Sequence, residues 1–115
     1  MDHFISVMKA LSDATRVRIL KILQIKTLCV CEIQELLDMA QPTVSKHMKA
    51  LEKAGLVKGD KDGLWVYYSL RYPSDNPYAA VLLGNLSHWF SDDAQIHQMV
   101  KRLPDIERKS GCKRS

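Results

Sequence analysis

Two cysteines separated by a single residue carry the most specific chemistry in this sequence. Cys29 and Cys31 lie in the segment Leu28-Cys29-Val30-Cys31-Glu32, at the start of an expected helix. Paired thiolates bind soft metal and metalloid ions, and a helix N-terminus favours the thiolate form. The pair therefore predicts a site for a thiol-seeking ion, with two small buried thiols that merely pack as the alternative.

The spacing of the pair also predicts how a bound ion would act. Residues i and i+2 point about 200° apart on an α-helix, so two helical sulfurs cannot share one ion. In an extended segment the same two side chains point the same way. Chelation by both thiols thus requires the start of the helix to be non-helical, or forces it to become so, which is the property of a switch.

The helices that must position the pair can be predicted from hydrophobic spacing. Apolar residues repeat at helical intervals from Phe4 to Leu11, and Asp13 supplies a cap for the next helix. Pro42 suits the first turn of a later helix, and Gly55 suits its left-handed end. Helices are expected at about 2–11, 14–25, 30–38 and 42–53, the last two joined by the tight turn of a helix-turn-helix.

The segment after the fourth helix predicts a β-hairpin, which makes the unit a winged helix. Its strands are expected at 56–58 and 64–70, with a turn from Asp60 to Gly63. A fifth helix at 77–90 and a sixth at 93–103, ending before Pro104, follow. We therefore expect a mainly α fold with a small β-hairpin (α+β). It forms a winged helix-turn-helix and dimerisation domain over residues 1–104, followed by a basic, flexible tail over 105–115.

The fourth helix is predicted to bind DNA. Val44, Met48 and Leu51 gather on the side that must face the core. The opposite face carries lysines and no acid, which suits phosphates and base edges in a major groove. A solvated lysine face is common on surface helices, but this helix is the second of a tight pair. The predicted DNA-binding residues are Gln41, Thr43, Ser45, Lys46, Lys49, Lys53 and Lys61.

The composition excludes several other classes of protein. The 115 residues carry a mild net charge of +4, and no apolar run approaches the ~18 residues that cross a bilayer. The start of the chain lacks the features of a secretory signal, so we expect a cytosolic protein whose three cysteines are thiols. No Ser-His-Asp set, glycine-rich phosphate loop or carboxylate pair supports an enzyme. The fifth helix has more apolar surface than one small core can cover, which predicts a dimer.

The sequence resembles the ArsR (ArsR/SmtB) family of metal-responsive repressors over roughly residues 5–90. The resemblance rests on the segments 11–20, 28–32, 41–48 and 63–70, which include Leu-Ser-Asp-Ala-Thr-Arg, Leu-Cys-Val-Cys-Glu and Gln-Pro-Thr-Val-Ser-Lys-His-Met. It implies a homodimer built from the first and fifth helices, which binds operator DNA when free and releases it when an ion binds. In the family's arsenical and antimonial sensors, the inducer binds at the positions where Cys29 and Cys31 stand.

The match departs from the family's pattern in its third ligand. The best-known arsenic site carries a cysteine three residues after the second, where this sequence has Gln34. A pyramidal trivalent metalloid takes three ligands, so the third would be Cys112 of either protomer or a small cellular thiol. The alternative is that Cys112 is an incidental exposed thiol. No permanently bound cofactor is expected, and the predicted inducer is arsenite or antimonite.

Other triggers on the same fold remain open. The cysteine pair could oxidise to a strained, easily reduced disulfide, or bind cadmium, lead or zinc, because soft-ligand chemistry does not separate these ions. The family's zinc site on the fifth helix is not expected, because Pro77 and Ser91 occupy two of the ligand positions that would complete Asp75 and His88.

Overall fold

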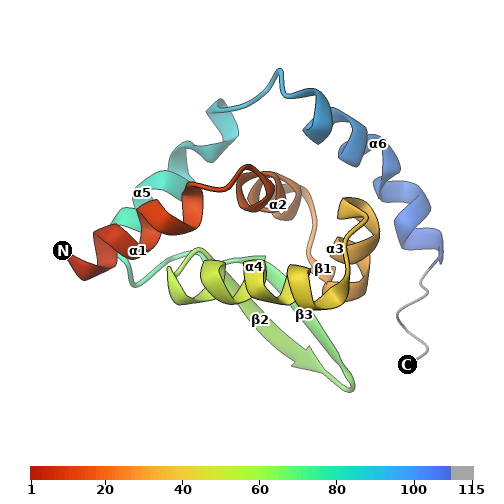
Figure 1. Cartoon of the computed structure of the whole chain (residues 1–115), viewed down its shortest axis with the longest axis horizontal. Coiled ribbons are helices and arrows are strands. Elements are labelled where there is room, and N and C mark those ends of the chain that lie inside the picture. Colours follow the sequence, from red (N-terminus) through yellow and green to blue (C-terminus); the bar gives the residue numbers. More distant parts are fainter. Residues whose placement is uncertain (110–115) are drawn as a thin grey trace.

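The computed structural model describes the backbone of residues 1–109, with side chains to residue 106 (Figure 1). It confirms a mainly helical fold with one small antiparallel sheet. No helix in this described part is long and apolar enough to span a membrane. The elements are α1 (Asp2–Leu11), α2 (Ala14–Ile25), β1 (Leu28–Cys29), α3 (Val30–Leu37), α4 (Gln41–Lys53), β2 (Val57–Asp62), β3 (Trp65–Leu70), α5 (Pro77–Asn85), the 3₁₀ helix η1 (Leu86–His88) and α6 (Ala94–Lys109).

The first four helices form where the apolar spacing predicts them, around one shared core. Asp13 caps α2, its carboxylate accepting from the backbone N–H of Arg16 at 3.2 Å. Each helix contributes side chains that are almost fully buried, and α4 supplies three of them. The most buried large side chains include Val7, Ile19, Leu20, Ile22, Val44, Met48 and Leu51. The core therefore fixes α4 on α1, α2 and α3.

The sheet has the strand order β1-β3-β2, with every pairing antiparallel. The sequence prediction missed β1, because two residues are too few to show an alternating pattern. Its hairpin turn was also too long. β2 continues to Asp62, paired with Trp65, so only Gly63 and Leu64 form the turn, and Gly63 adopts a φ of +66°. Lys61 consequently lies in a strand and not in the turn.

The fifth helix is shorter than predicted. α5 ends at Asn85, whose side-chain amide donates to the Val81 carbonyl at 2.9 Å and so competes with the helical hydrogen bonds. The chain tightens into η1, and Phe90 then takes a left-handed φ of +62°. These local bonds redirect the chain towards α6 before the predicted end at residue 90.

The sixth helix is longer than predicted, and its expected end before Pro104 is wrong. α6 passes through Pro104 to Lys109, so the predicted domain boundary at 104/105 falls inside it. Pro104 cannot donate a backbone hydrogen bond, but Leu103 and Ile106 on either side are buried in the core. The Arg102 guanidinium also donates to the Glu35 and Leu36 carbonyls, at 2.9 and 3.0 Å. These tertiary contacts outweigh the local preference of proline.

An ion pair joins the start of α6 to α2. The Arg18 guanidinium donates to both carboxylate oxygens of Asp93 at 3.3 Å. That hydrogen bond, with a second from the backbone N–H of Ile96, holds the pKa of Asp93 below its ordinary value of 3.8. The folded state thus binds a proton at Asp93 less readily than the unfolded chain does.

We expect Asp93→Asn to destabilise the protein in a pH-dependent way. Because the folded-state pKa is lowered, the ion pair stabilises the fold fully above the ordinary pKa and is lost as the pH falls through the lowered value. The urea midpoint of Asp93→Asn should therefore lie below that of the wild type at pH 7, with the difference closing below about pH 4. Asp92→Asn, at the exposed neighbouring position, is the control. A difference that stayed constant down to pH 2.5 would contradict this account.

Candidate DNA-reading face and thiol site

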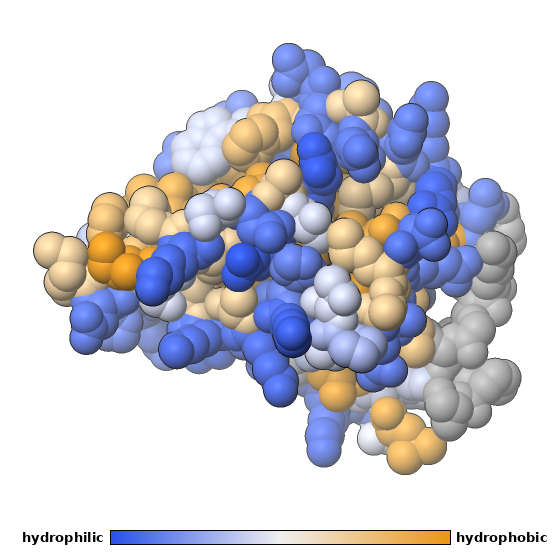
Figure 2. Space-filling model, viewed as in Figure 1, coloured by the Kyte–Doolittle hydropathy of each residue, from blue (hydrophilic) through white to orange (hydrophobic). Residues whose placement is uncertain are grey.

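The exposed face of α4 has the composition predicted from the sequence. Val44, Met48 and Leu51 are fully buried, which turns the opposite side of the helix to solvent. Six of the seven predicted DNA-binding residues are exposed, and Ser45 is half-buried. The exposed six are Gln41, Thr43, Lys46, Lys49, Lys53 and, on β2, Lys61. Hydrophilic side chains gather over this region in Figure 2.

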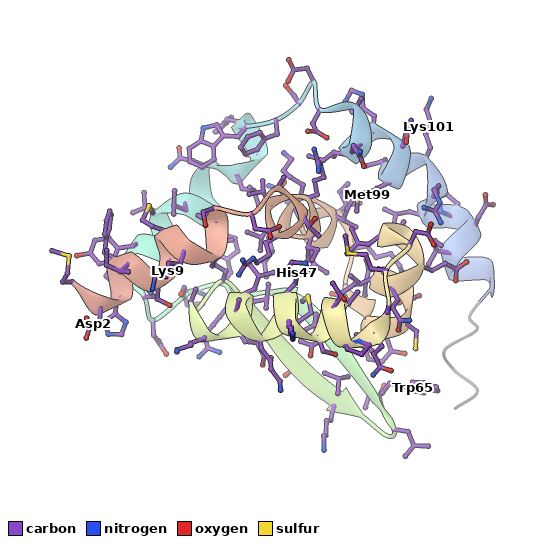
Figure 3. The ribbon with its side chains drawn as sticks, viewed as in Figure 1. Asp2, Lys9, His47, Trp65, Met99 and Lys101 are labelled. Atoms are coloured by element: carbon purple, nitrogen blue, oxygen red, sulfur yellow. The ribbon has the colours of Figure 1, made fainter. Side chains whose placement is uncertain are left out.

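His47 borders the core side of α4, as the sequence suggested. It is half-buried and lies between α4 and α2 in Figure 3. Partial burial opposes ionisation of the neighbouring Asp13, but the Arg16 backbone hydrogen bond and the charges of His47 and Arg16 lower the pKa of Asp13 overall. His47 thus belongs to the contact between these two helices.

A buried asparagine, which the sequence reading missed, fixes the end of α4. Gly55 follows the helix with a φ of +77°, as predicted. The Asn76 side chain donates to the Ala54 carbonyl at 3.2 Å and accepts from the backbone N–H groups of Tyr78 and Ala79. Asn76 therefore joins the end of α4 to the start of α5. Asparagine before Pro77 is a helix-capping signal in the sequence. The hydrogen bond from Asn76 to the Ala54 carbonyl, by contrast, can be recognised only in the structure.

The two cysteines lie on either side of a strand–helix junction. Cys29 is buried, with 2% of its surface exposed, and is the last residue of β1, paired with Tyr67 of β3. Its backbone is extended, whereas Cys31 is half-buried in the first turn of α3. Within the described residues, neither cysteine forms a disulfide. An extended backbone would let both sulfurs bind one ion. That extended conformation is present at Cys29 and ends at Val30, where α3 begins.

A reciprocal capping box defines that junction. The backbone N–H of Cys29 donates to the Glu32 carboxylate at 2.9 Å, and the Cys29 side chain faces the backbone N–H of Glu32 in return. Glutamate three residues after a capping residue is a known signal, but cysteine is not a usual cap, so the sequence reading overlooked it. The thiol site and the first turn of α3 are therefore one structural unit.

The contacts of this unit lead towards both elements that are predicted to bind DNA, α4 and the wing formed by β2 and β3. β3 lies between β1 and β2, so Cys29 is hydrogen-bonded into the same sheet as the wing strand that carries Lys61. At its other end, α3 turns into α4 through Asp38, whose φ is +55°. Within β3, burial and the nearby Glu52 carboxylate raise the pKa of Tyr68.

The described residues hold no group of three or more His, Cys, Asp or Glu side chains that could bind a metal ion. Cys112, the expected third ligand, lies outside them. Asp75 forms an ion pair with Arg71 at 3.3 Å, and His88 ends η1. The two thiols thus fit a soft ion in donor type but supply only two of three ligands.

A helix-turn-helix followed by a paired wing, with a basic second helix, defines a winged helix-turn-helix DNA-binding protein. Residues 13–58 match the family model described as "Bacterial regulatory protein, arsR family". The chain is 38% identical over 101 residues to the arsenic resistance transcriptional regulator ArsR1 of Pseudomonas putida, covering 84% of this chain and 79% of the relative. It is 33% identical over 100 residues to the arsenical resistance operon repressor of Escherichia coli, covering 86% and 83%.

A solved structure agrees with these relatives. It is the homodimeric winged helix-turn-helix domain of a possible ArsR-family regulator from Mycobacterium bovis, with a TM-score of 0.64 and 28% identity, covering 76% of this chain and 77% of that one. The chain belongs to the ArsR family. It is accordingly a DNA-binding transcriptional regulator and not an enzyme.

We expect Glu32→Ala to weaken the start of α3, because it removes the acceptor for the Cys29 N–H. The loss should be about 1 kcal/mol in the free energy of unfolding, with faster amide exchange at residues 29–34. Gln34→Ala, two residues further along the same helix, is the control for helix propensity. Equal exchange rates in the two variants would show that the capping box does not stabilise the junction.

Proposed function

We propose that this protein is a homodimeric repressor that leaves its operator when trivalent arsenic or antimony binds Cys29 and Cys31. The observation that carries the proposal is the position of the pair at the β1–α3 junction. Relatives named as arsenic resistance regulators support the choice of inducer. A cytosolic location remains a prediction.

In the proposed repressor, α4 enters the major groove. Gln41, Thr43 and Ser45 lie in the first turns, where a recognition helix meets base edges, and Lys46, Lys49 and Lys53 suit phosphates. Lys61 would contact the backbone from the wing. Two such helices about 34 Å apart would read two half-sites of one operator.

The release step follows from the backbone at the thiol site. For both sulfurs to bind one ion, Val30 and Cys31 must leave the helical conformation and continue the extended direction of Cys29. That change would break the capping box and shorten α3, which has only eight residues. Because α3 supports α4 through a short turn, loss of its first turn would shift or loosen the DNA-reading face.

The third ligand is proposed to be Cys112 or a small cellular thiol. Two thiols also suit cadmium, lead or zinc, and a vicinal disulfide would be an oxidative trigger at the same place. Titrating each of these agents against the protein–DNA complex distinguishes the triggers.

We expect arsenite to release the wild-type protein from DNA but not Cys29→Ser/Cys31→Ser. Anisotropy of a labelled duplex from the promoter of the protein's own gene measures release under reducing conditions. The double variant must first bind the duplex as the wild type does. Cys112→Ser should lower inducer sensitivity only if Cys112 is the third ligand. Retention of DNA by the wild type would contradict the arsenic proposal, and cadmium, zinc and peroxide would be titrated next.

The proposed dimer surface is an apolar patch on α1 and α5, which we call the α1–α5 patch. The Phe4 and Tyr78 rings meet edge to face, with centroids 5.3 Å apart, and join the two helices. Val81 is 63% exposed, and Phe4, Met8 and Tyr78 are each more than a third exposed. Exposed apolar side chains of this size gathered on two helices are typical of an interface.

Val81→Asp should therefore shift the protein from dimer to monomer, because burying a carboxylate in an apolar interface is costly. Sedimentation velocity at micromolar concentration measures the change. Ile25→Asp places the same charge at another exposed apolar position, 57% exposed on α2, and should leave the mass unchanged. An unaltered dimer in Val81→Asp would exclude the α1–α5 patch as the interface.

A further inference from the structure

A groove of about 610 Å³ lies between α1 and α4, beside the DNA-reading face; we call it the α1–α4 groove. Three helices each contribute one cation to it: Lys9 from α1, Arg16 from α2 and Lys53 from α4. The small residues Ala10 and Ala50 also line it, and their short side chains leave room between the helices. In Figure 3, Lys9 lies on the side of α1 that faces α4.

The groove is electropositive. Three cations line it against one carboxylate, that of Asp2 at the start of α1. Lys9 and Lys53 are both exposed, and neither forms a salt bridge within the described part of the chain. Their ammonium groups are therefore available to an anionic partner.

Arg16 has unused hydrogen-bonding capacity. Its Nε is buried and has no hydrogen-bond partner among the described residues. Among the described residues, its guanidinium forms an ion pair with Asp13 that is long, at 3.7 Å. A guanidinium presents five N–H donors, and anionic oxygens are the partners that suit them best.

The groove continues the surface predicted to face DNA. Lys53 and Ala50 belong both to the groove and to the exposed side of α4 that carries Lys46. A duplex lying along α4 would thus bring a strand of its backbone to the mouth of the groove.

We propose that the α1–α4 groove binds a phosphate of the operator backbone, with Lys9, Arg16 and Lys53 as its ligands. This inference rests on the proposed DNA-binding function and adds two helices to the surface that the sequence predicted. Such a contact fixes the orientation of the protein on the duplex and carries no sequence information.

The test compares Lys9→Gln with the wild type on the promoter duplex and on an unrelated duplex of the same length, from 50 to 300 mM salt. Affinity near 150 mM should fall roughly fivefold for one lost phosphate contact and up to about thirtyfold for the two in a dimer. The loss should be similar on both duplexes. The slope of log affinity against log salt should decrease by about 1 to 2. Lys9→Arg, which keeps the charge, should retain affinity.

Two further variants separate the possible failures. Lys101→Gln removes another exposed charge, on α6, where Lys101 points away from the core in Figure 3. If Lys9→Gln behaves like Lys101→Gln while Lys49→Gln weakens binding, the groove proposal is wrong and the α4 face stands. If the wild type binds neither duplex, the proposed function fails and the groove proposal fails with it. Urea midpoints of all variants exclude loss of folding as the cause.

Discussion

The change from extended to helical backbone at Cys29 is the constraint on which the proposed switch depends. Cys29 ends β1, pairs with Tyr67 and caps α3 through the capping box that it forms with Glu32. An isolated helix of eight residues is marginal in water, so α3 relies on its caps and on its buried side chains. Arg102 supplies the cap at the other end by bonding two terminal carbonyls. A ligand that alters the first turn therefore acts on a helix with few bonds of its own.

The same junction connects the thiol site to both elements that are proposed to bind DNA, α4 and the wing. Through α3 it reaches the turn before α4, and through β1 it is bonded to β3, which carries the wing strand β2 on its other edge. A displacement of Cys29 would therefore move the sheet, whereas a displacement of Cys31 would move α3. Because the two cysteines belong to different elements, an ion that draws them together must shift one element relative to the other.

The sequence predicted those parts of the fold whose signals are local. Periodic apolar residues, the Asp13 cap and the left-handed Gly55 located the first four helices to within a residue or two. The missing parts depend on contacts between distant segments. β1 exists because β3 pairs with it, α6 passes Pro104 because Leu103 and Ile106 are buried against the core, and Asn76 joins two helices. At the site, the exposed face of α4 and the cysteine pair were predictable from the sequence. The capping role of Glu32 and the roles proposed for Lys9 and Arg16 were not, since they depend on neighbours that only folding brings together.

The placement of charge decides where electrostatic attraction to DNA would arise, because the net charge of +4 is small. Lys61 of the wing is one of the predicted DNA-binding residues, yet β2 carries Asp60 and Asp62 beside Lys58 and Lys61, and the Lys58 ammonium lies 3.9 Å from the Asp60 carboxylate. The strand is therefore close to neutral. Among the described elements, α4 and the helices beside it would then supply most of the proposed attraction to phosphate. The wing would then contact DNA through its shape and through the side chains near its tip, including Trp65 in Figure 3. A shift of β3 would therefore change how the wing fits the duplex more than it would change the electrostatic attraction to phosphate.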